Sequence, residues 1–388
     1  MSRLLDVFWG YIQKCDKLLW LMTLCASIYG FFLIYSMQRA ADYNFLLTQL
    51  VAVGIGYIGA IIISVIDYKR ICDFWFIPAF VSLVLLMLVF GVGMRVSGTD
   101  DTAWLRLPGG ITFQPSELAK IAFIITFSKH LDYLCKIDKL KSFFGTVSLF
   151  LHAAIPVIII HMQGDDGSAI IFMLMFMIMA FCAGVQLRYF AVLFGGAAVL
   201  LPIIWNRFLN NEHRNRILSL FNTDESNLSD YAWQQYQAKV SIASGGLSGT
   251  GYYKGERVAS YIVPEQENDF IFTVAGEELG FIGCAAILII LFGIMLKCLF
   301  NCSSCKDDLG KYICIGFFSL LFAQTVINIG MVLGILPVIG ITLPFFSSGG
   351  TSAMCLYLGF GLVQSVFIHN EDDNKIKLRI DKFSLARQ

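Results

Sequence analysis

The chain of 388 residues is 57% hydrophobic and 14% charged, with a mean hydropathy of +0.71 and no net charge at pH 7. Soluble globular domains carry about 25% charged residues, so the composition excludes that class and indicates a protein that lies in lipid. The balanced charge gives no reason to expect a nucleic-acid partner.

Runs of about 18 or more apolar residues are typical of helices that span a membrane. The sequence contains ten such runs, at residues 18–37, 45–66, 74–94, 117–134, 146–162, 168–186, 188–206, 270–298, 312–334 and 351–369. They predict an all-α, polytopic membrane protein with one integral domain over residues 1–388. One long exterior loop is expected at about 207–269, and no separate soluble domain.

The basic residues predict which way this bundle faces. Ten spans place both termini on one side, and an excess of Lys and Arg marks the cytoplasmic side. A connection on the side of the termini contains Lys129, Lys136, Lys139 and Lys141. The short loops opposite, with the helix ends beside them, contain only Arg39, Arg95, Arg106 and Lys120. Both termini are therefore expected in the cytoplasm.

The first exterior cluster in chain order is "WLRLPGGITFQPSELAK", residues 104–120. Ser116 is expected to cap the helix that follows, with Glu117 in its first turn, where the helix dipole favours an acid. Lys120 lies one turn further on. It either forms an ion pair with Glu117 that lets a lysine enter the membrane, or offers positive potential to an anion such as a phosphate.

Two further exterior segments follow. "QGDDGSA", residues 163–169, places Asp165 and Asp166 in a tight turn, either simply solvated or part of a site. The segment 207–269 is long enough to indicate a functional loop. It contains several aromatic residues and the glycine-rich stretch "SIASGGLSGTGYYKG", residues 241–255, which favours an ordered loop with tight turns.

The stretch "PEQENDFIFTVAGEELG", residues 264–280, gathers five acids without a Lys or Arg. Glu277 and Glu278 fall inside the helix that begins near Phe270, so they are expected to face the bundle interior or an aqueous cleft rather than lipid. Asp269 stands where an N-cap belongs, and Asp is a favoured cap. From the residues alone, Asp269 is either a cap or a catalytic group.

The last segment, "NIGMVLGILPVIGITLPFFSSGGTS", residues 328–352, is interrupted by prolines and glycines and predicts an irregular lining of a cavity. Together, "WL…FQPSELAK", "SIASGGLSGTG", "VPEQENDFIFTVAGEELGF" and "NIGMVLGILPVIGITLPFFSSGG" resemble the SEDS family of bacterial cell-wall synthases, the RodA/FtsW group. The resemblance covers nearly the whole chain, and the form "NIGMVLGILPV" favours the RodA branch.

This resemblance implies a glycosyltransferase of the bacterial cytoplasmic membrane that polymerises lipid II into peptidoglycan strands on the outer face, for cell elongation and rod shape. Its implied partners are lipid II, the growing glycan strand, membrane lipid and a class B penicillin-binding protein. In the family the aspartate before "FIF" is catalytic, which here is Asp269. The other family positions found in this sequence are Trp104, Glu117, Lys120, Asp165 and Lys239. The chain departs from the family pattern at Asp166, Glu267 and Ser348.

Glycosyl transfer from an α-linked donor to a β-1,4 product inverts the anomeric centre and needs one base to activate the acceptor hydroxyl. Asp269 is the candidate base, and its neighbours Glu265 and Glu267 are expected to raise its pKa. The leaving pyrophosphate needs positive charge. The candidates are Lys120, Lys239, Arg214 and Arg216. No cofactor is required by this chemistry, although a divalent cation, Mg²⁺ or Mn²⁺, is an open alternative for the same task.

Two rival functions fit the same spans. A flippase for lipid-linked sugars would also use buried ions and broken helices, but it needs polar residues along a path to both faces. A non-catalytic scaffold for a penicillin-binding protein would leave the acid cluster without a role. The crowding of acids on the outer side favours the polymerase.

Overall fold

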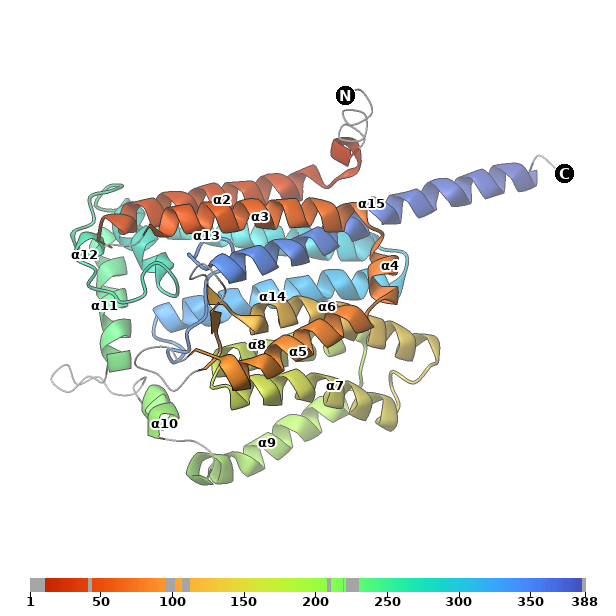
Figure 1. The fold of residues 1–388 in the computed structure, drawn as a ribbon, viewed down its shortest axis with the longest axis horizontal. Coiled ribbons are helices and arrows are strands. Elements are labelled where there is room, and N and C mark those ends of the chain that lie inside the picture. The colour runs from red at the N-terminus through yellow and green to blue at the C-terminus, as the bar shows by residue number, and fades with distance from the viewer. Residues whose placement is uncertain are drawn as a thin grey trace.

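In the computed structural model of the chain, long helices run side by side and a shorter helix, α11, stands across one end of the bundle (Figure 1). The structure describes residues 11–40, 44–94, 102–106, 112–207, 211–218, 220 and 230–385. The first half contains α2 (Lys17–Met37), η1 (Gln38–Ala40), α3 (Phe45–Val65), α4 (Tyr68–Asp73), α5 (Phe76–Val92), α6 (Pro115–Lys136), α7 (Phe143–Met162) and α8 (Asp166–Ala183). The second half contains α9 (Leu187–Arg207), α10 (Asn211–Leu218), α11 (Asp230–Gly245), α12 (Glu256–Ala259), α13 (Ile271–Ser304), α14 (Asp308–Val332) and α15 (Gly350–Leu385).

Each of the ten predicted spans corresponds to one of these helices, which confirms the all-α membrane fold. Among the described residues, eight helices are long and apolar enough to cross a membrane. The other two are α5, a shorter apolar helix of 17 residues, and α6, which contains Glu117 and Lys120. The number of crossings therefore stays a prediction.

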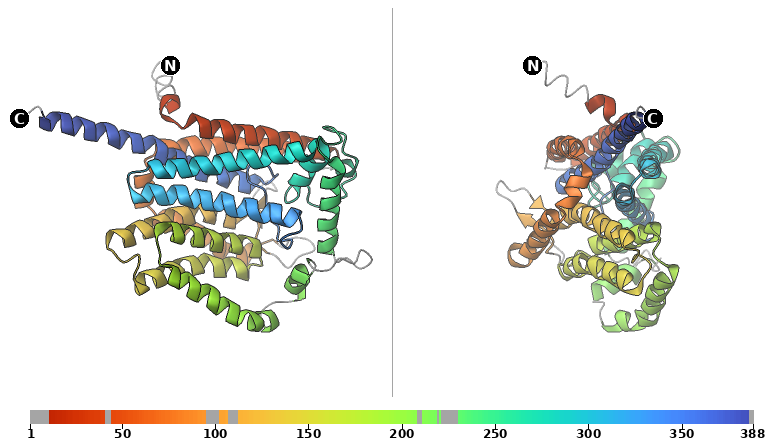
Figure 2. Two further views of the ribbon diagram at one scale, coloured as in Figure 1. Left: turned by 180° about the vertical axis from the view of Figure 1, so that it is seen from behind. Right: turned by 90° about the vertical axis from the view of Figure 1, so that its right-hand side faces the viewer.

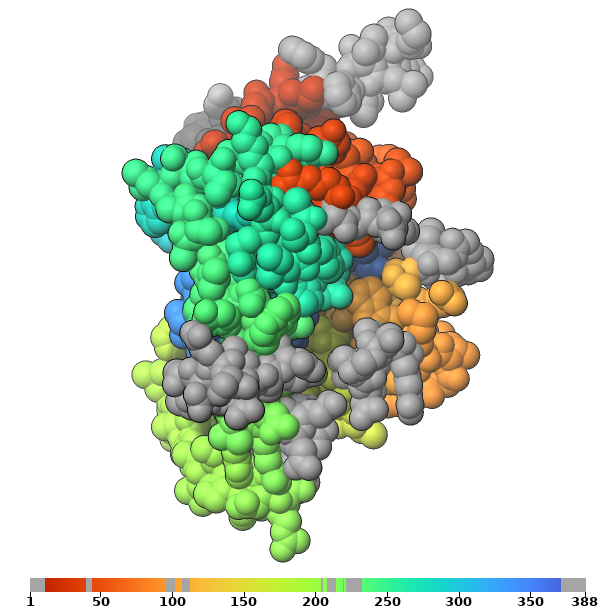
Figure 3. All heavy atoms as spheres, turned by 90° about the vertical axis from the view of Figure 1, so that its left-hand side faces the viewer, coloured from red at the N-terminus to blue at the C-terminus, as the bar shows by residue number. Residues whose placement is uncertain are grey.

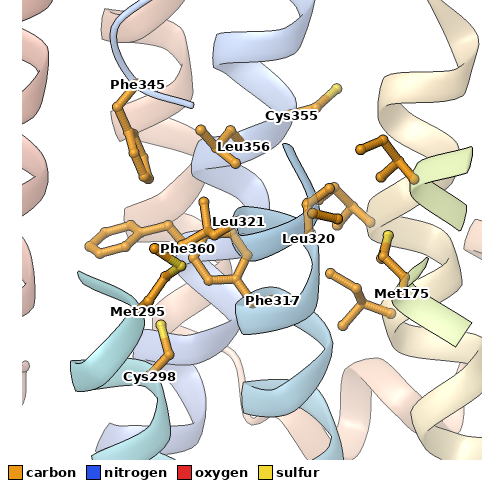
Figure 4. Close-up of a cluster of buried hydrophobic side chains, with 14 of the residues drawn as sticks. Met175, Met295, Cys298, Phe317, Leu320, Leu321, Phe345, Cys355, Leu356 and Phe360 are labelled. Atoms are coloured by element: carbon orange, nitrogen blue, oxygen red, sulfur yellow. The ribbon is translucent and has the colours of Figure 1, made fainter. Parts of the chain in front are cut away.

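The centre of the bundle is formed by α14 and α15. In their most apolar windows, 72% and 78% of the residues are buried, against 6% in α9, which exposes nearly all of its surface. Apolar side chains from α8, α13, α14 and α15 fill the interior, as the cluster around Phe317, Leu321 and Phe360 illustrates (Figure 4). These apolar contacts pack the four helices closely together at the centre of the bundle.

The two ends of the bundle differ in character. Helix α2 begins, and α15 leaves the bundle, at the end opposite α11 and α12 (Figures 1 and 2). The connection from α6 to α7, with Lys139 and Lys141, lies at that same end (Figure 1). The end with α11 and α12 also holds the only strands in the described part of the chain, β1 (Leu105–Arg106) and β2 (Thr112–Phe113), which pair antiparallel.

Helix α13 is broken at Gly280, which adopts φ +66° and ψ −158°. The glycine-rich loop after α11 fills the break with its backbone. The amides of Thr250 and Gly251 donate to the carbonyls of Glu277 and Glu278 (2.9 and 3.1 Å), and the amide of Phe281 donates to the carbonyl of Gly246 (2.9 Å). A Cβ at Gly249 would lie 2.1 Å from the carbonyl oxygen of Glu278. The loop can approach this closely only because it carries glycine there.

The two acids just before the break hold the same loop. Glu278, fully buried, accepts hydrogen bonds from Ser36 Oγ, from Arg39 Nη2 (2.8 Å) and from the amides of Tyr253 and Gly255. Glu277 accepts from the amides of Arg257 and Val258 (2.9 and 3.1 Å) at the start of α12. Both face the bundle interior, as expected, and their role is to anchor the loop.

Candidate active site

A cavity of about 420 Å³ opens at the end of the bundle covered by α11 and α12, the end that Figure 3 faces. Its wall combines segments far apart in the sequence. They are the residues just before β1, the start of α6, the turn between α7 and α8, α10, α11, the acid segment 265–269, α14, and the irregular stretch between α14 and α15. Residues 338–342 and 348–349 of that stretch line the cavity, in line with the sequence expectation for residues 328–352.

The structure brings five of the eight candidate residues to this cavity. They are Trp104, Glu117, Asp165, Arg216 and Asp269. Lys120 lies behind Glu117 and is fully buried. The remaining two, Arg214 and Lys239, lie elsewhere.

Arg214 and Lys239 do not line the cavity. The guanidinium of Arg214 donates to the carbonyls of Trp205 and Asn206 (2.9 and 3.1 Å) and fastens α10 to the end of α9. Lys239 is exposed on α11, with its Nζ beside Gly334, where an added Cβ would lie 3.0 Å away. A cationic role for either residue in this cavity has no support from the geometry.

The three acids of the segment 265–269 differ in their hydrogen bonds. Glu265 accepts from Asn268 Nδ2 (2.8 Å), and Glu267 accepts from the hydroxyl of Tyr261 (2.8 and 3.0 Å). Among the described residues, none donates a hydrogen bond to the carboxylate of Asp269. Asp269 is thus the acid of this segment whose oxygens remain available to a ligand in the cavity.

Capping does not account for Asp269. The N-cap of α13 is Phe270, and no side chain caps that helix. The sequence left open that Asp269 is only a helix cap, and the structure does not show this role. The expectation that Ser116 caps α6 was also wrong. Pro115 occupies the first helical position, Gln114 is the N-cap, and the Ser116 hydroxyl donates to Asp165 instead.

Burial, and to a smaller extent the nearby carboxylates of Glu265 and Glu267, together raise the pKa of Asp269 to about 7. Burial also raises the pKa of Glu267. The direction agrees with the prediction from sequence. A carboxyl group with a pKa near neutrality can take up a proton during a reaction and release it again at the working pH.

Asp165 is neither a solvated turn residue nor a free carboxylate. Its Oδ1 accepts from the Ser168 amide (2.9 Å) and caps α8, while its Oδ2 accepts from Gln114 Nε2 and Ser116 Oγ (2.8 and 2.9 Å). It therefore ties the start of α8 to the start of α6. The neighbouring Asp166 lines the cavity and pairs with His161 Nδ1 (2.5 Å).

Glu117 and Lys120 form an ion pair of 2.8 Å. Glu117 reaches the cavity, whereas the ammonium group of Lys120 lies behind it in the bundle. Of the two readings of Lys120, the structure shows the ion pair directly. Arg216, on α10, is the candidate cation that itself lines the cavity.

Several cavity residues were missed because they are uncharged. They are Gln114, Gln234, Gln324, Thr342 and Ser352. The sequence does contain a signal for polar residues on one face of α14. Gln324 and Asn328 lie one turn apart within the apolar run 312–334, and polar residues inside a span commonly face protein rather than lipid.

A resident metal centre does not fit the acids of this cavity. In the described ranges, no three His, Cys, Asp or Glu side chains are grouped closely enough to hold a metal ion. Asp165, another acid of the cavity, already accepts three hydrogen bonds. The steps considered below therefore use only the side chains of this chain.

Comparison with protein families gives a match over almost the whole chain. The family described as "Cell cycle protein", which takes in FtsW, RodA and SpoVE, matches residues 16–372. The chain is 30% identical over 366 residues to the probable peptidoglycan glycosyltransferase FtsW of Trichlorobacter lovleyi, covering 92% of this chain and 93% of that protein. It is 28% identical over 366 residues to the peptidoglycan glycosyltransferase MrdB of Escherichia coli K12, covering 94% and 96%.

Solved structures share the fold. A chain from a study titled "Structural coordination of polymerization and crosslinking by a peptidoglycan synthase complex" superposes with a TM-score of 0.77 at 24% identity, covering 92% of this chain and 98% of that one. The crystal structure of the rod shape determining protein RodA of Thermus thermophilus superposes with a TM-score of 0.67 at 24% identity, covering 92% and 97%.

Proposed function

The chain belongs to the FtsW, RodA and SpoVE family, and from this membership we propose that it is a peptidoglycan glycosyltransferase that polymerises lipid II into glycan strands. The relatives named above support the activity class, since both carry that enzyme name. As a family member with many apolar helices, it is a multi-pass protein of a bacterial membrane.

The observation that carries the proposal is the state of Asp269. Its carboxylate lines a cavity of about 420 Å³, receives no hydrogen bond from the described residues, and has a pKa raised to about 7. An unpartnered carboxylate with that pKa is suited to general-base catalysis. The two neighbouring acids each accept a side-chain hydrogen bond, Glu265 from Asn268 and Glu267 from Tyr261.

The reaction then follows a single displacement. The acceptor sugar hydroxyl attacks the anomeric carbon of the donor, and its proton passes to the carboxylate of Asp269. The bond from that carbon to the lipid pyrophosphate breaks, and the pyrophosphate leaves with the electron pair, which inverts the centre. Arg216, the candidate cation on the cavity wall, is placed to stabilise the leaving group's charge.

The side of the membrane and the cellular process are further parts of the proposal. The clustered lysines between α6 and α7 favour a cytoplasmic position for that end, which leaves the cavity outside the cell. The form "NIGMVLGILPV" favours side-wall elongation over division. We expect a class B penicillin-binding protein as partner, in keeping with the crosslinking named for the structurally similar synthase complex.

A flippase receives less support from the same geometry. Such a protein needs a polar path from one face to the other. Between the cavity and the opposite end, the helices α8, α13, α14 and α15 meet through apolar side chains such as Leu320, Leu356 and Met295 (Figure 4). This packed layer favours a protein that works at one face.

The test is polymerisation by purified protein, with and without a crosslinking partner, of fluorescently labelled lipid II, read as glycan ladders on a gel. Wild-type protein should produce ladders and Asp269→Asn should not. Glu256→Gln is the matched control, because Glu256 is an exposed acid on α12 outside the cavity. Ladders from Asp269→Asn at the wild-type rate would remove Asp269 as the base.

A further inference from the structure

Asn328 lies in α14 with no exposed surface and does not line the cavity. Its Nδ2 donates two hydrogen bonds, one to the backbone carbonyl of Asp269 (2.7 Å) and one to that of Ile341 (2.6 Å). Its Oδ1 has no hydrogen-bond partner among the described residues. One buried carboxamide thus joins the segment of Asp269 to the irregular stretch between α14 and α15.

The bond from Asn328 is one of three that hold consecutive carbonyls. The carbonyl of Glu267 accepts from the Ser348 amide (2.7 Å), and that of Asn268 accepts from the Ser347 hydroxyl (2.5 Å). The carbonyl of Asp269 completes the set. Because successive carbonyls point in different directions, three separate donors leave the backbone of residues 267–269 little freedom to rotate.

The second hydrogen bond of Asn328, to the carbonyl of Ile341, holds the segment that lies against the side chain of Asp269. Ile341 lies beside Gly340, where an added Cβ would be 3.5 Å from Oδ2 of Asp269. The carboxylate therefore lies against the segment 338–342, and the carboxamide of Asn328 sets the spacing between the two. A displacement of about 1 Å in a reacting group can lower the rate of an enzyme about 10²-fold.

The chemistry of asparagine suits this position, and its Oδ1 has no partner among the described residues. A buried polar atom without a partner costs about 1–3 kcal/mol. Aspartate would remove both donors, and an apolar residue would leave two carbonyls without a partner. Only a side chain with an NH₂ group can serve both carbonyls from this position.

We propose that Asn328 is a positioning residue for glycosyl transfer, which bridges Asp269 and Ile341 and holds the carboxylate of Asp269 in place against the segment 338–342. The effect on rate depends on the function proposed above, whereas the effect on the backbone of residues 267–269 does not. The two can therefore be measured separately.

The chain offers a closely matched control. Gln235, on α11, is also buried, and its Nε2 also donates to two carbonyls of the neighbouring stretch, those of Met331 (3.0 Å) and Leu336 (2.6 Å). Asn328→Leu and Gln235→Leu thus remove the same kind of double bridge, with a similar loss of stability. Only the first removes a bond to Asp269.

Two measurements on detergent-purified protein decide the question. Backbone hydrogen exchange of peptides covering residues 265–273 should become faster in Asn328→Leu than in the wild type, and should stay unchanged in Gln235→Leu. In the lipid II assay, Asn328→Leu should lower kcat about 10²-fold with KM within about threefold, while Gln235→Leu keeps kcat within about threefold.

Equal exchange in the two variants, or equal losses of kcat, would make Asn328 an ordinary packing residue and overturn the proposal. A wild-type protein that forms no ladders would refute the proposed function, and the exchange measurement would still judge the bridge. If Asn328→Leu does not accumulate in the membrane, Asn328→Ser, which keeps one donor, is judged by the same two measurements.

Discussion

Replacing Asp269 by asparagine should lower the polymerisation rate and raise the stability of the folded protein. The amide keeps the shape of the side chain but cannot accept a proton from a hydroxyl group. We expect the polymerisation rate to fall about 10²-fold or more, the usual contribution of a general base. At the same time, the variant should be more stable than the wild type at pH 8, because a carboxylate whose charge is unfavourable in the folded protein is removed.

The magnitude follows from the pKa of Asp269, which is about 7 in the folded protein against an ordinary value of 3.8. Between these values the folded state binds one more proton than the unfolded state, so the free energy of unfolding decreases as the pH rises. A pKa difference of about 3, at about 1.4 kcal/mol for each pH unit, corresponds to about 4 kcal/mol above pH 7. Because Asp269 is partly exposed at the cavity, solvent screening reduces this figure, and a gain of about 2 kcal/mol is expected.

The assay is thermal unfolding of purified wild-type and Asp269→Asn protein in detergent at pH 5 and pH 8. The melting temperature of the wild type should fall relative to that of the variant as the pH rises, and the difference should be smaller at pH 5 than at pH 8. The polymerisation rate of the wild type should fall about tenfold for each pH unit below 7, where Asp269 becomes protonated. A variant that is less stable than the wild type at pH 8, or whose advantage is the same at both pH values, would refute this reasoning.

Three further outcomes follow from the fold. Lys120→Met leaves the buried carboxylate of Glu117 without its partner and should cost about 3–5 kcal/mol of stability, measured as loss of folded protein in detergent. The double variant with Glu117→Gln should recover this stability, and failure to recover it would assign Lys120 a role beyond the ion pair. Ser248→Cys should react with a membrane-impermeant maleimide in cells without an outer membrane, and Ser303→Cys should not; reversed labelling would invert the orientation. Gly280→Ala places a Cβ on a residue with φ +66°, within 2.4 Å of the Gly249 amide nitrogen, which costs at least about 1–3 kcal/mol. The variant should therefore accumulate poorly in the membrane. Normal accumulation would show that the break in α13 is not needed.

The helices could be predicted from the sequence because lipid imposes a simple requirement on length and polarity. About 20 apolar residues are needed to cross the membrane, so helices such as α2 and α3 begin and end within a residue or so of the expected runs. The helices within the segment 207–269 could not be predicted in the same way. Helix α11 stands across one end of the bundle and is stabilised by contacts with α13, which local composition does not reveal.

The roles of the acids illustrate what the sequence leaves open. Asp269 and Glu278 are nine positions apart, yet Glu278 accepts hydrogen bonds from Ser36, Arg39 and the loop before α12, while the carboxylate of Asp269 accepts none from the part of the chain that the structure describes. These partners come from distant parts of the chain. Only the folded structure shows which carboxylates are already occupied. For the same reason, the sequence could suggest Arg214 and Lys239 as cations for the leaving pyrophosphate, but it could not show that they lie outside the cavity.

The break in α13 has a consequence for how the protein depends on its membrane. Residues 281–304 form a helix of about 36 Å, longer than a hydrocarbon layer of about 30 Å, so this part must tilt as the bilayer becomes thinner. The glycine-rich loop after α11 binds both parts of α13. It donates to the carbonyls of Glu277 and Glu278 on the short helix at residues 271–279, and it accepts from the amides of Phe281 and Ile282 on the long part. A change in the tilt of the long part is therefore transmitted to the loop and to the short helix that follows Asp269. We expect the polymerisation rate to depend on the thickness of the bilayer.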